Sequence, residues 1–123
     1  MAFEQFRLPD DGALQENAPV ARPVKTEELL GVLNSVERKF APEELYCAGD
    51  TSLLQTPSVS IVGSRAASRA GIARAQRFAR LLVDRGVTVV SGLAEGIDTA
   101  AHQATIQGNG RTIAVLGTPL ERT

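Results

Sequence analysis

Apolar residues gather into three short runs in the second half of the chain, and a glycine closely follows each run. The runs cover residues 59–62, 87–90 and 112–116, and the glycines are Gly63, Gly92 and Gly117. Short β-branched and apolar runs that end at a turn residue are typical of buried strands. The sequence therefore predicts three core strands, each followed by a tight turn.

The segments between these runs have helical periodicity. Residues 70–85 carry apolar residues on one side and arginines on the other, and residues 98–107 form a shorter, alanine-rich segment. The apolar stripe consists of Ile72, Ala75, Phe78, Ala79 and Leu82, and the arginines opposite it are Arg74, Arg77 and Arg80. Apolar strands that alternate with helices indicate an α/β fold, with a parallel sheet of about three strands covered on both faces.

The first part of the chain is predicted to hold a flexible arm, one helix and one short strand. Residues 1–24 show no apolar periodicity and are expected to be an arm, which leaves residues 25–123 as the folded domain. A helix is expected from Thr26, which can cap it, as far as Pro42, and a possible edge strand at residues 45–48. The apolar stripe of that helix consists of Leu29, Leu33, Val36 and Phe40.

Composition is that of an ordinary globular domain and narrows the range of functions. The 123 residues are 43% hydrophobic and 22% charged, and no run approaches the ~18 apolar residues that a membrane helix needs. The single cysteine, Cys47, cannot form an internal disulfide and is expected to be buried, so a cytoplasmic location is expected. One cysteine and one histidine do not favour a metal site, and no cofactor is expected.

Charge is divided unevenly along the chain. Residues 1–58 contain five basic and ten acidic side chains, whereas residues 59–123 contain eight arginines and four acidic side chains. The planar guanidinium of arginine suits phosphate, so the basic half indicates contact with a polyanion. The alternative is that the arginines only solvate a helix face, and the sequence leaves both interpretations open.

The turns after the three strands are the candidate binding site, because the carboxyl ends of parallel strands meet at one edge of a sheet. Glycines let the backbone approach an anion, and exposed amides, hydroxyls and arginines bind phosphate. The alternative is that Gly63 only turns the chain. Arg65 would then pair with a carboxylate, Glu95 or Asp98. Neither a G-x-G-x-x-G fingerprint after the first strand nor a P-loop is present. The candidate phosphate-binding residues are Gly63, Ser64, Arg65, Arg69, Ser91, Gly92, Gly96, Gly117 and Thr118.

Asp98 and His102 lie four residues apart, one turn along the last predicted helix. Asp98 is expected to be the N-cap of that helix, and the two residues are expected to form a structural contact. The alternatives are contact of Asp98 with a ligand and proton transfer by the pair. The sequence offers no nucleophile, second histidine or convergent pair of carboxylates, so an enzyme is not predicted.

Three motifs give the chain a family resemblance. They are Val62-Gly63-Ser64-Arg65, residues 91–102 (SGLAEGIDTAAH) and residues 110–117 (GRTIAVLG). In order and spacing they resemble the Rossmann-like domain of the DprA/Smf DNA-processing proteins, over about residues 40–120. The resemblance implies a Rossmann-like three-layer fold, binding and protection of single-stranded DNA, and loading of the RecA recombinase during natural transformation. It also implies a set of phosphate-facing residues: Gly63, Ser64 and Arg65, with Ser91, Gly92 and Gly117 lining the same pocket.

The chain departs from the family pattern at three points. Ala70 stands where the family usually has an aromatic residue, Pro119 stands where it usually has a second glycine, and the sequence ends at Thr123 while the family domain continues. An uncovered edge of such an incomplete sheet is expected to drive self-association, as a homodimer or a larger assembly. The alternatives to a DNA-binding module are a sensor of a small nucleotide ligand and a remnant that only assembles.

Any affinity for DNA is expected to come from phosphate contacts. Phe78 is the only aromatic residue after residue 58 and lies on the predicted core face, so stacking of bases on aromatic rings is mostly excluded. Arg69, Arg74 and Arg77 are expected to add a peripheral positive field around Arg65.

Overall fold

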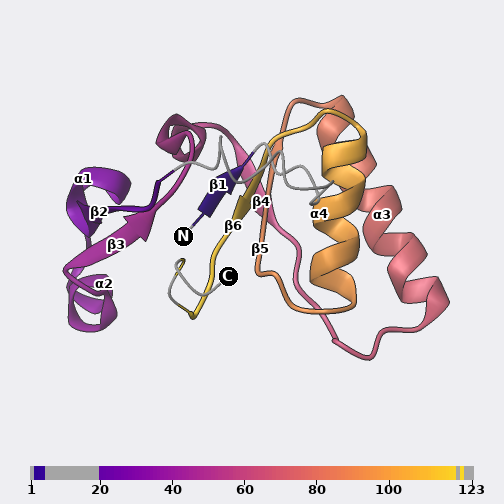
Figure 1. The fold of residues 1–123 in the computed structure, drawn as a ribbon, viewed down its shortest axis with the longest axis horizontal. Helices are drawn as coiled ribbons and strands as arrows, with labels where there is room; N and C mark the ends of the chain where they lie inside the picture. Colours follow the sequence, from indigo (N-terminus) through magenta and orange to yellow (C-terminus); the bar gives the residue numbers. More distant parts are fainter. Residues whose placement is uncertain (1, 5–19, 119, 121–123) are drawn as a thin grey trace.

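The computed structural model describes residues 2–4, 20–118 and 120. A four-stranded sheet lies at its centre (Figure 1). Three of its strands are parallel and adjacent: β4 (Ser58–Ser60), β5 (Thr88–Ser91) and β6 (Thr112–Ala114). Val59 lies beside Val89, and Val90 lies beside Ile113. The prediction of a short parallel sheet of about three core strands is therefore confirmed.

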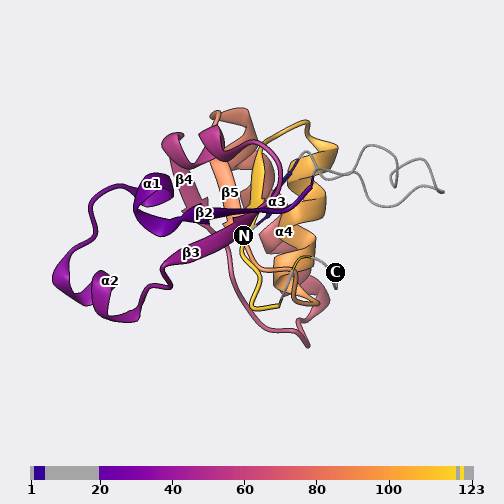
Figure 2. The same cartoon turned by 60° about the vertical axis from the view of Figure 1, so that its left-hand side comes forward.

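Two helices cover one face of this sheet. α3 (Arg69–Asp84) connects β4 to β5, and α4 (Ile97–Gln107) connects β5 to β6. Both crossovers advance the sheet in the same direction, which for the usual right-handed connection places both helices on one side. Figures 1 and 2 show the two helices packed side by side. The core beneath them consists of Ile61, Ala79, Leu82, Val89, Ala101 and Ala104.

The other face of the sheet is covered by the first part of the chain (Figure 1). β2 (Arg22–Lys25) and β3 (Glu44–Cys47) form a separate antiparallel pair, accompanied by α1 (Thr26–Leu30), α2 (Ser35–Phe40) and the 3-10 helix η1 (Thr51–Gln55). Leu29, Cys47 and Leu53 pack against Ile113 from this side. The fold has the three layers that were predicted, and its third layer is this two-stranded unit. The strand expected at residues 45–48 is β3, which pairs with β2 instead of the parallel sheet.

Parts of the segment expected to be a flexible arm form strands. β1 (Ala2–Glu4) pairs antiparallel with β6, so that Ala2 lies beside Ala114, and β2 begins at Arg22. Residues 1 and 5–19 of the expected arm lie outside the described residues. A strand of three residues is too short to show periodicity, so its pairing is decided by the neighbouring strand and leaves little signal in the sequence.

The helix expected from Thr26 to Pro42 is broken in two. Thr26 is the first residue of α1 and not its cap, and its hydroxyl donates to the carbonyl of Pro42 at 2.5 Å. Gly31 ends α1 with a φ of 79°, and Asn34 caps α2, because its side-chain oxygen accepts hydrogen bonds from the amides of Val36 and Glu37. A left-handed glycine followed by a new cap stops one helix and begins another.

Two apolar stripes are less buried than predicted. In the first part of the chain Leu29 is buried, but Val36 and Phe40 are 64% and 75% exposed, because the break at Gly31 redirects the rest of the predicted helix. In α3 the residue Phe78 is 46% exposed, although the sequence predicts that it lies on the core face. The buried members of that stripe are Ala75, Ala79 and Leu82.

Candidate functional site

The loop after β4 lies against the start of α4. The amide of Ile97, the first residue of α4, donates to the carbonyl of Ser64 at 3.2 Å. A Cβ atom at Gly63 would lie 2.7 Å from the side chain of Ile97, and one at Gly96 would lie 2.7 Å from the carbonyl oxygen of Arg65. Gly96 also has a φ of +81°, which residues with a side chain rarely adopt. Glycine at these two positions therefore allows the close approach that fixes the loop.

Asp98 is not the cap of α4. Gly96 holds that position, and the carboxylate of Asp98 instead joins the ends of two strands. Its Oδ1 accepts a hydrogen bond from the amide of Gly63 at 3.3 Å, and its Oδ2 accepts one from the amide of Gly92 at 3.2 Å. The two amides expected to bind phosphate are thus engaged by a buried side chain of the same chain.

His102 holds the same turn from its other side. Its Nε2 lies 2.5 Å from the carbonyl oxygen of Gly92, and its Nδ1 lies 2.6 Å from the hydroxyl of Thr112 in β6. A carbonyl can only accept, so Nε2 carries the proton. The Thr112 hydroxyl also lies 3.0 Å from the carbonyl oxygen of Val89, so in the neutral ring Nδ1 competes with that carbonyl for the single hydroxyl proton. Burial lowers the pKa of His102, against smaller opposite effects of the Gly92 carbonyl and the Asp98 carboxylate. Asp98 and His102 together hold Gly92 by its amide and by its carbonyl.

Ser91 faces the interior of the sheet. Its side chain is buried, and its hydroxyl donates to the carbonyl of Ile61 at 2.5 Å, which ties β5 to the end of β4. The structure therefore places Ser91 beneath the site and not on its surface, contrary to the prediction that it contacts phosphate. Alternation along β5 explains this position, since Val89 and Ser91 share the face that the helices cover.

The turn after β6 is less closely tied to the other two. Gly117 and Thr118 are exposed, and a Cβ atom at Gly117 would meet no atom within 4 Å. The amide of Val115 donates to the carbonyl of Ser91 at 2.9 Å, which joins this segment to the end of β5. The structure thus brings Gly63, Gly92 and Gly96 together and leaves these two residues at the margin.

Three of the predicted residues lie exposed between β4 and the first turn of α3. They are Ser64, Arg65 and Arg69. The Ser64 hydroxyl accepts a hydrogen bond from the amide of Ala66 at 3.2 Å, which shapes the turn and leaves the hydroxyl proton available. Further exposed arginines follow along α3: Arg74, Arg77 and Arg80.

Arg65 does not pair with Glu95 or Asp98. Among the described residues, the ion pair within 4 Å joins Arg38 to Glu27, at 3.8 Å, and both side chains are well exposed. The carboxylate of Asp98 is turned to backbone amides instead. The guanidinium of Arg65 therefore stands at the surface without a carboxylate partner among the residues that the structure describes.

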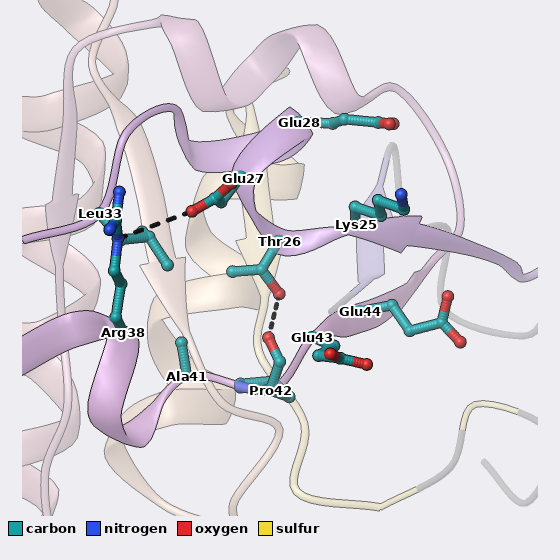
Figure 3. Close-up of a pocket in the computed structure, with 10 residues that line it drawn as sticks. All are labelled: Lys25, Thr26, Glu27, Glu28, Leu33, Arg38, Ala41, Pro42, Glu43 and Glu44. Atoms are coloured by element: carbon teal, nitrogen blue, oxygen red, sulfur yellow. Dashed lines mark hydrogen bonds and ion pairs between the residues drawn. The ribbon is translucent and has the colours of Figure 1, made fainter.

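A pocket of about 790 Å³ lies in the first part of the chain, beside α1, α2 and the ends of β2 and β3 (Figure 3). Its charged lining consists of Glu27, Glu28, Glu43 and Glu44 with Lys25 and Arg38. Figure 3 shows the ion pair between Arg38 and Glu27 at one side of this pocket. Four carboxylates against two cations repel a polyanion, so this pocket does not compete with the glycine turns as a phosphate site.

The described part of the chain contains neither a candidate metal site nor a candidate membrane-spanning helix. No group of three His, Cys, Asp or Glu side chains there could hold a metal ion. No helix in that part is long and apolar enough to span a membrane.

The bridging position of Asp98 is the feature that sequence reasoning missed. An aspartate just before a helical segment is first interpreted as a cap, and it meets the strand ends only once the fold is known. The available signal was the preceding Gly96, which can itself begin the helix and so leaves the carboxylate free for other donors.

Comparison with known sequences supports one family. The sequence model described as DNA recombination-mediator protein A matches residues 28–123. The chain is 47% identical over 81 residues to the DNA processing protein DprA of Streptococcus pneumoniae, which covers 66% of this chain and 28% of that protein. It is 46% identical over 79 residues to Protein Smf of Escherichia coli, covering 64% of this chain and 21% of that protein.

Solved structures agree with this result. An X-ray structure of DprA from Streptococcus pneumoniae has a TM-score of 0.69 and 35% identity, over 92% of this chain and 40% of that one. A structure of DprA from Helicobacter pylori, which concerns its single-stranded DNA binding mode, has a TM-score of 0.63 and 31% identity. The match covers 78% of this chain and 42% of that chain. The chain spans less than half the length of these relatives. On the motifs, the fold and these matches, the chain belongs to the DNA recombination-mediator protein A family, also called DprA/Smf.

Proposed function

We propose that this chain is a single-stranded DNA-binding module of a recombination mediator, which acts by holding phosphates and performs no catalytic step. Arg65 carries this proposal, because its guanidinium is exposed and has no carboxylate partner among the described residues. The loop that bears Arg65 is fixed against α4 through Ser64, so little conformational freedom is lost on binding. A free guanidinium on a fixed loop suits a bidentate phosphate contact.

The neighbouring residues extend the proposed interface along the surface. The Ser64 hydroxyl can donate to a phosphate oxygen beside Arg65, and Arg69 begins the row of arginines on α3. Gly117 and Thr118 are proposed contacts at the margin of the same end of the sheet. The amides of Gly63 and Gly92 are not included, because Asp98 engages both.

The relatives support single-stranded DNA as the ligand. One of the similar structures describes how DprA of Helicobacter pylori binds single-stranded DNA. From the resemblance of the three sequence motifs to the DprA/Smf family we propose contact with the RecA recombinase. We also propose self-association, because β4 stands at the end of the strand order and its outer edge has no partner strand in the described sheet.

A sensor of small nucleotides is the rival function. It would use the strand-end amides to cradle a terminal phosphate, as Rossmann-like proteins do. The hydrogen bonds of Asp98 to these amides weigh against this function. A chain that only assembles would have no use for a free Arg65, and it is separated from the proposal by the same binding experiment.

The experiment is fluorescence anisotropy of a labelled oligo-dT, titrated with wild type, Arg65→Ala, Arg65→Lys and Arg85→Ala at several salt concentrations. Arg85 is the matched control, because it is exposed and lies past the far end of α3, about 24 Å from the start of that helix at 1.5 Å per residue. The sedimentation coefficient of each variant reports its assembly state.

Wild type and Arg85→Ala are expected to bind alike, with an affinity that falls steeply as salt rises. Arg65→Ala is expected to bind at least tenfold more weakly and to lose about 0.7 from the log–log salt slope, the amount for one phosphate on a single strand. Arg65→Lys should keep the salt slope of wild type but bind more weakly than wild type, because lysine keeps the charge but not the bidentate geometry. An equal loss of affinity for oligo-dT in Arg65→Ala and Arg85→Ala would reject the proposal, and so would the absence of binding by wild type.

A further inference from the structure

The ends of β4 and β5 present two backbone amides to one point. The amide of Gly63 follows β4, the amide of Gly92 follows β5, and both donate to the two oxygens of a single carboxylate, at 3.3 and 3.2 Å. Converging amides at the carboxyl ends of parallel strands are the usual place where α/β proteins bind the phosphate of a nucleotide. In this chain the group at that place is Asp98.

The cradle formed by these two amides is full. Asp98 is 6% exposed, and a Cβ atom at Gly92 would lie only 2.9 Å from its Oδ2. A phosphate could reach the amides only by displacing the carboxylate, which would then be buried next to another anion without its donors. Both the lost hydrogen bonds and the like charge oppose this exchange.

We propose that Asp98 is a built-in anion that fills the strand-end cradle, excludes terminal phosphates of mononucleotides from it, and holds the loop of Arg65 in place. Gly63, which Asp98 binds, stands two residues before Arg65, so the same contact sets the start of that loop. Asp98 is thus a positioning residue that also decides specificity. Phosphates of a DNA strand are left to the exposed groups of the outer loop, and that last step rests on the proposed function.

The first test uses the wild-type chain. Its melting temperature is followed while inorganic phosphate, or AMP, replaces sodium chloride at constant ionic strength. Because the cradle is occupied, neither probe is expected to give a saturable rise in melting temperature. A saturable rise, or a saturable heat on calorimetric titration with AMP, would overturn the inference.

The second test empties the cradle with Asp98→Ala. Two amides lose a charged acceptor, so the melting temperature is expected to fall by about 10 °C. Sodium formate, which has the size and charge of the missing carboxylate, is expected to restore most of this loss in a saturable way at constant ionic strength. Inorganic phosphate should restore part of it. Absence of any rescue by formate would overturn the inference.

A matched control separates anion rescue from general salt effects. Thr99→Ala removes another side-chain hydrogen bond at the start of α4, from Thr99 Oγ1 to the carbonyl of Ala94 at 2.7 Å, without removing an anion. Formate should leave its melting temperature unchanged, and equal rescue of both variants would reject a specific cradle.

The test of the Asp98 cradle can be interpreted even if the alanine variant does not fold or the wild-type chain does not bind DNA. If Asp98→Ala does not fold at the working temperature, Asp98→Asn keeps the side-chain volume and tests the charge, and the wild-type titrations remain decisive. Failure of wild type to bind oligo-dT would reject the proposed function while leaving the formate result unaffected. The two proposals can therefore fail independently.

Discussion

The imidazole Nε2 of His102 lies 2.5 Å from the carbonyl oxygen of Gly92, and this contact ties the middle of α4 to the turn after β5. Asp98, one helical turn earlier, binds the amide of the same glycine. Two side chains at i and i+4 of one helix therefore hold one residue of the turn from both ends. A rotation or shift of α4 would break both contacts, so both hydrogen bonds oppose such a movement.

The burial of His102 predicts a loss of stability at acid pH. Burial lowers the pKa of His102 in the folded chain, while the unfolded chain keeps a value near 6.5. Between these two values the unfolded state binds more protons, so the free energy of unfolding falls as the pH falls. The slope of the free energy of unfolding against pH can reach about 1.4 kcal/mol per pH unit for one titrating group. Urea unfolding at pH steps below 7 measures it.

The control for this prediction is His102→Asn, which removes the only histidine of the chain. The variant should be less stable at neutral pH but should show a flatter dependence between pH 7 and 5.5. A variant with the wild-type slope would mean that another group titrates, and the prediction would then be wrong.

Gly96→Ala is expected to dislodge the loop of Arg65. The added methyl would run into the carbonyl oxygens of Ser64 and Arg65, at a φ of +81°. Gly31→Ala is the matched control, because Gly31 has a φ of +79° and nothing within 4 Å of its Cβ position. In the control, backbone strain alone should lower the free energy of unfolding by about 1 kcal/mol. In Gly96→Ala the free energy of unfolding should fall by about 2 kcal/mol more than in the control. Equal losses in urea unfolding would contradict the close approach.

Cys47 reports on the contact between the first part of the chain and the sheet. Its side chain is 1% exposed and packs in the cluster that contains Ile113, and burial raises the pKa of its thiol. Both effects lower the concentration of accessible thiolate. Reaction with Ellman's reagent should therefore be about 10³-fold or more slower than in denaturant. Rapid labelling of the folded chain would show that β2 and β3 detach readily from the sheet.

The part of the fold that follows local periodicity could be predicted from the sequence. The three parallel strands and α3 and α4 were expected within one or two residues of their bounds, because apolar runs and an amphipathic stripe decide them locally. The side on which each helix lies, and the two-stranded unit on the opposite face, depend on contacts far apart in the sequence. The pairing of Ala2 with Ala114 is such a contact.

The candidate site was predicted by position more accurately than by role. Gly63, Gly92 and Gly96 meet at one end of the sheet as the strand order requires. The group that accepts hydrogen bonds from the amides of Gly63 and Gly92 depends on the orientation of α4. The sequence does not determine that orientation. A serine after a strand suggests a turn and so predicts a surface position for Ser91. In the structure Ser91 is the last residue of β5 and points inward.

The half-exposed ring of Phe78 allows a decisive test of how DNA would be held. Phe78 lies nine residues after Arg69, about 14 Å along α3, among exposed arginines. Stacking of a base on an aromatic ring contributes about 1–3 kcal/mol, or about 5- to 150-fold in affinity per base. If phosphates provide the affinity, an abasic oligonucleotide should bind within about threefold of oligo-dT, and Phe78→Ala should leave both unchanged. Competition of the two unlabelled strands against labelled oligo-dT measures the ratio. A tenfold preference for oligo-dT that disappears in Phe78→Ala would show instead that bases stack on α3, and the interface would then have to extend from Arg65 along that helix.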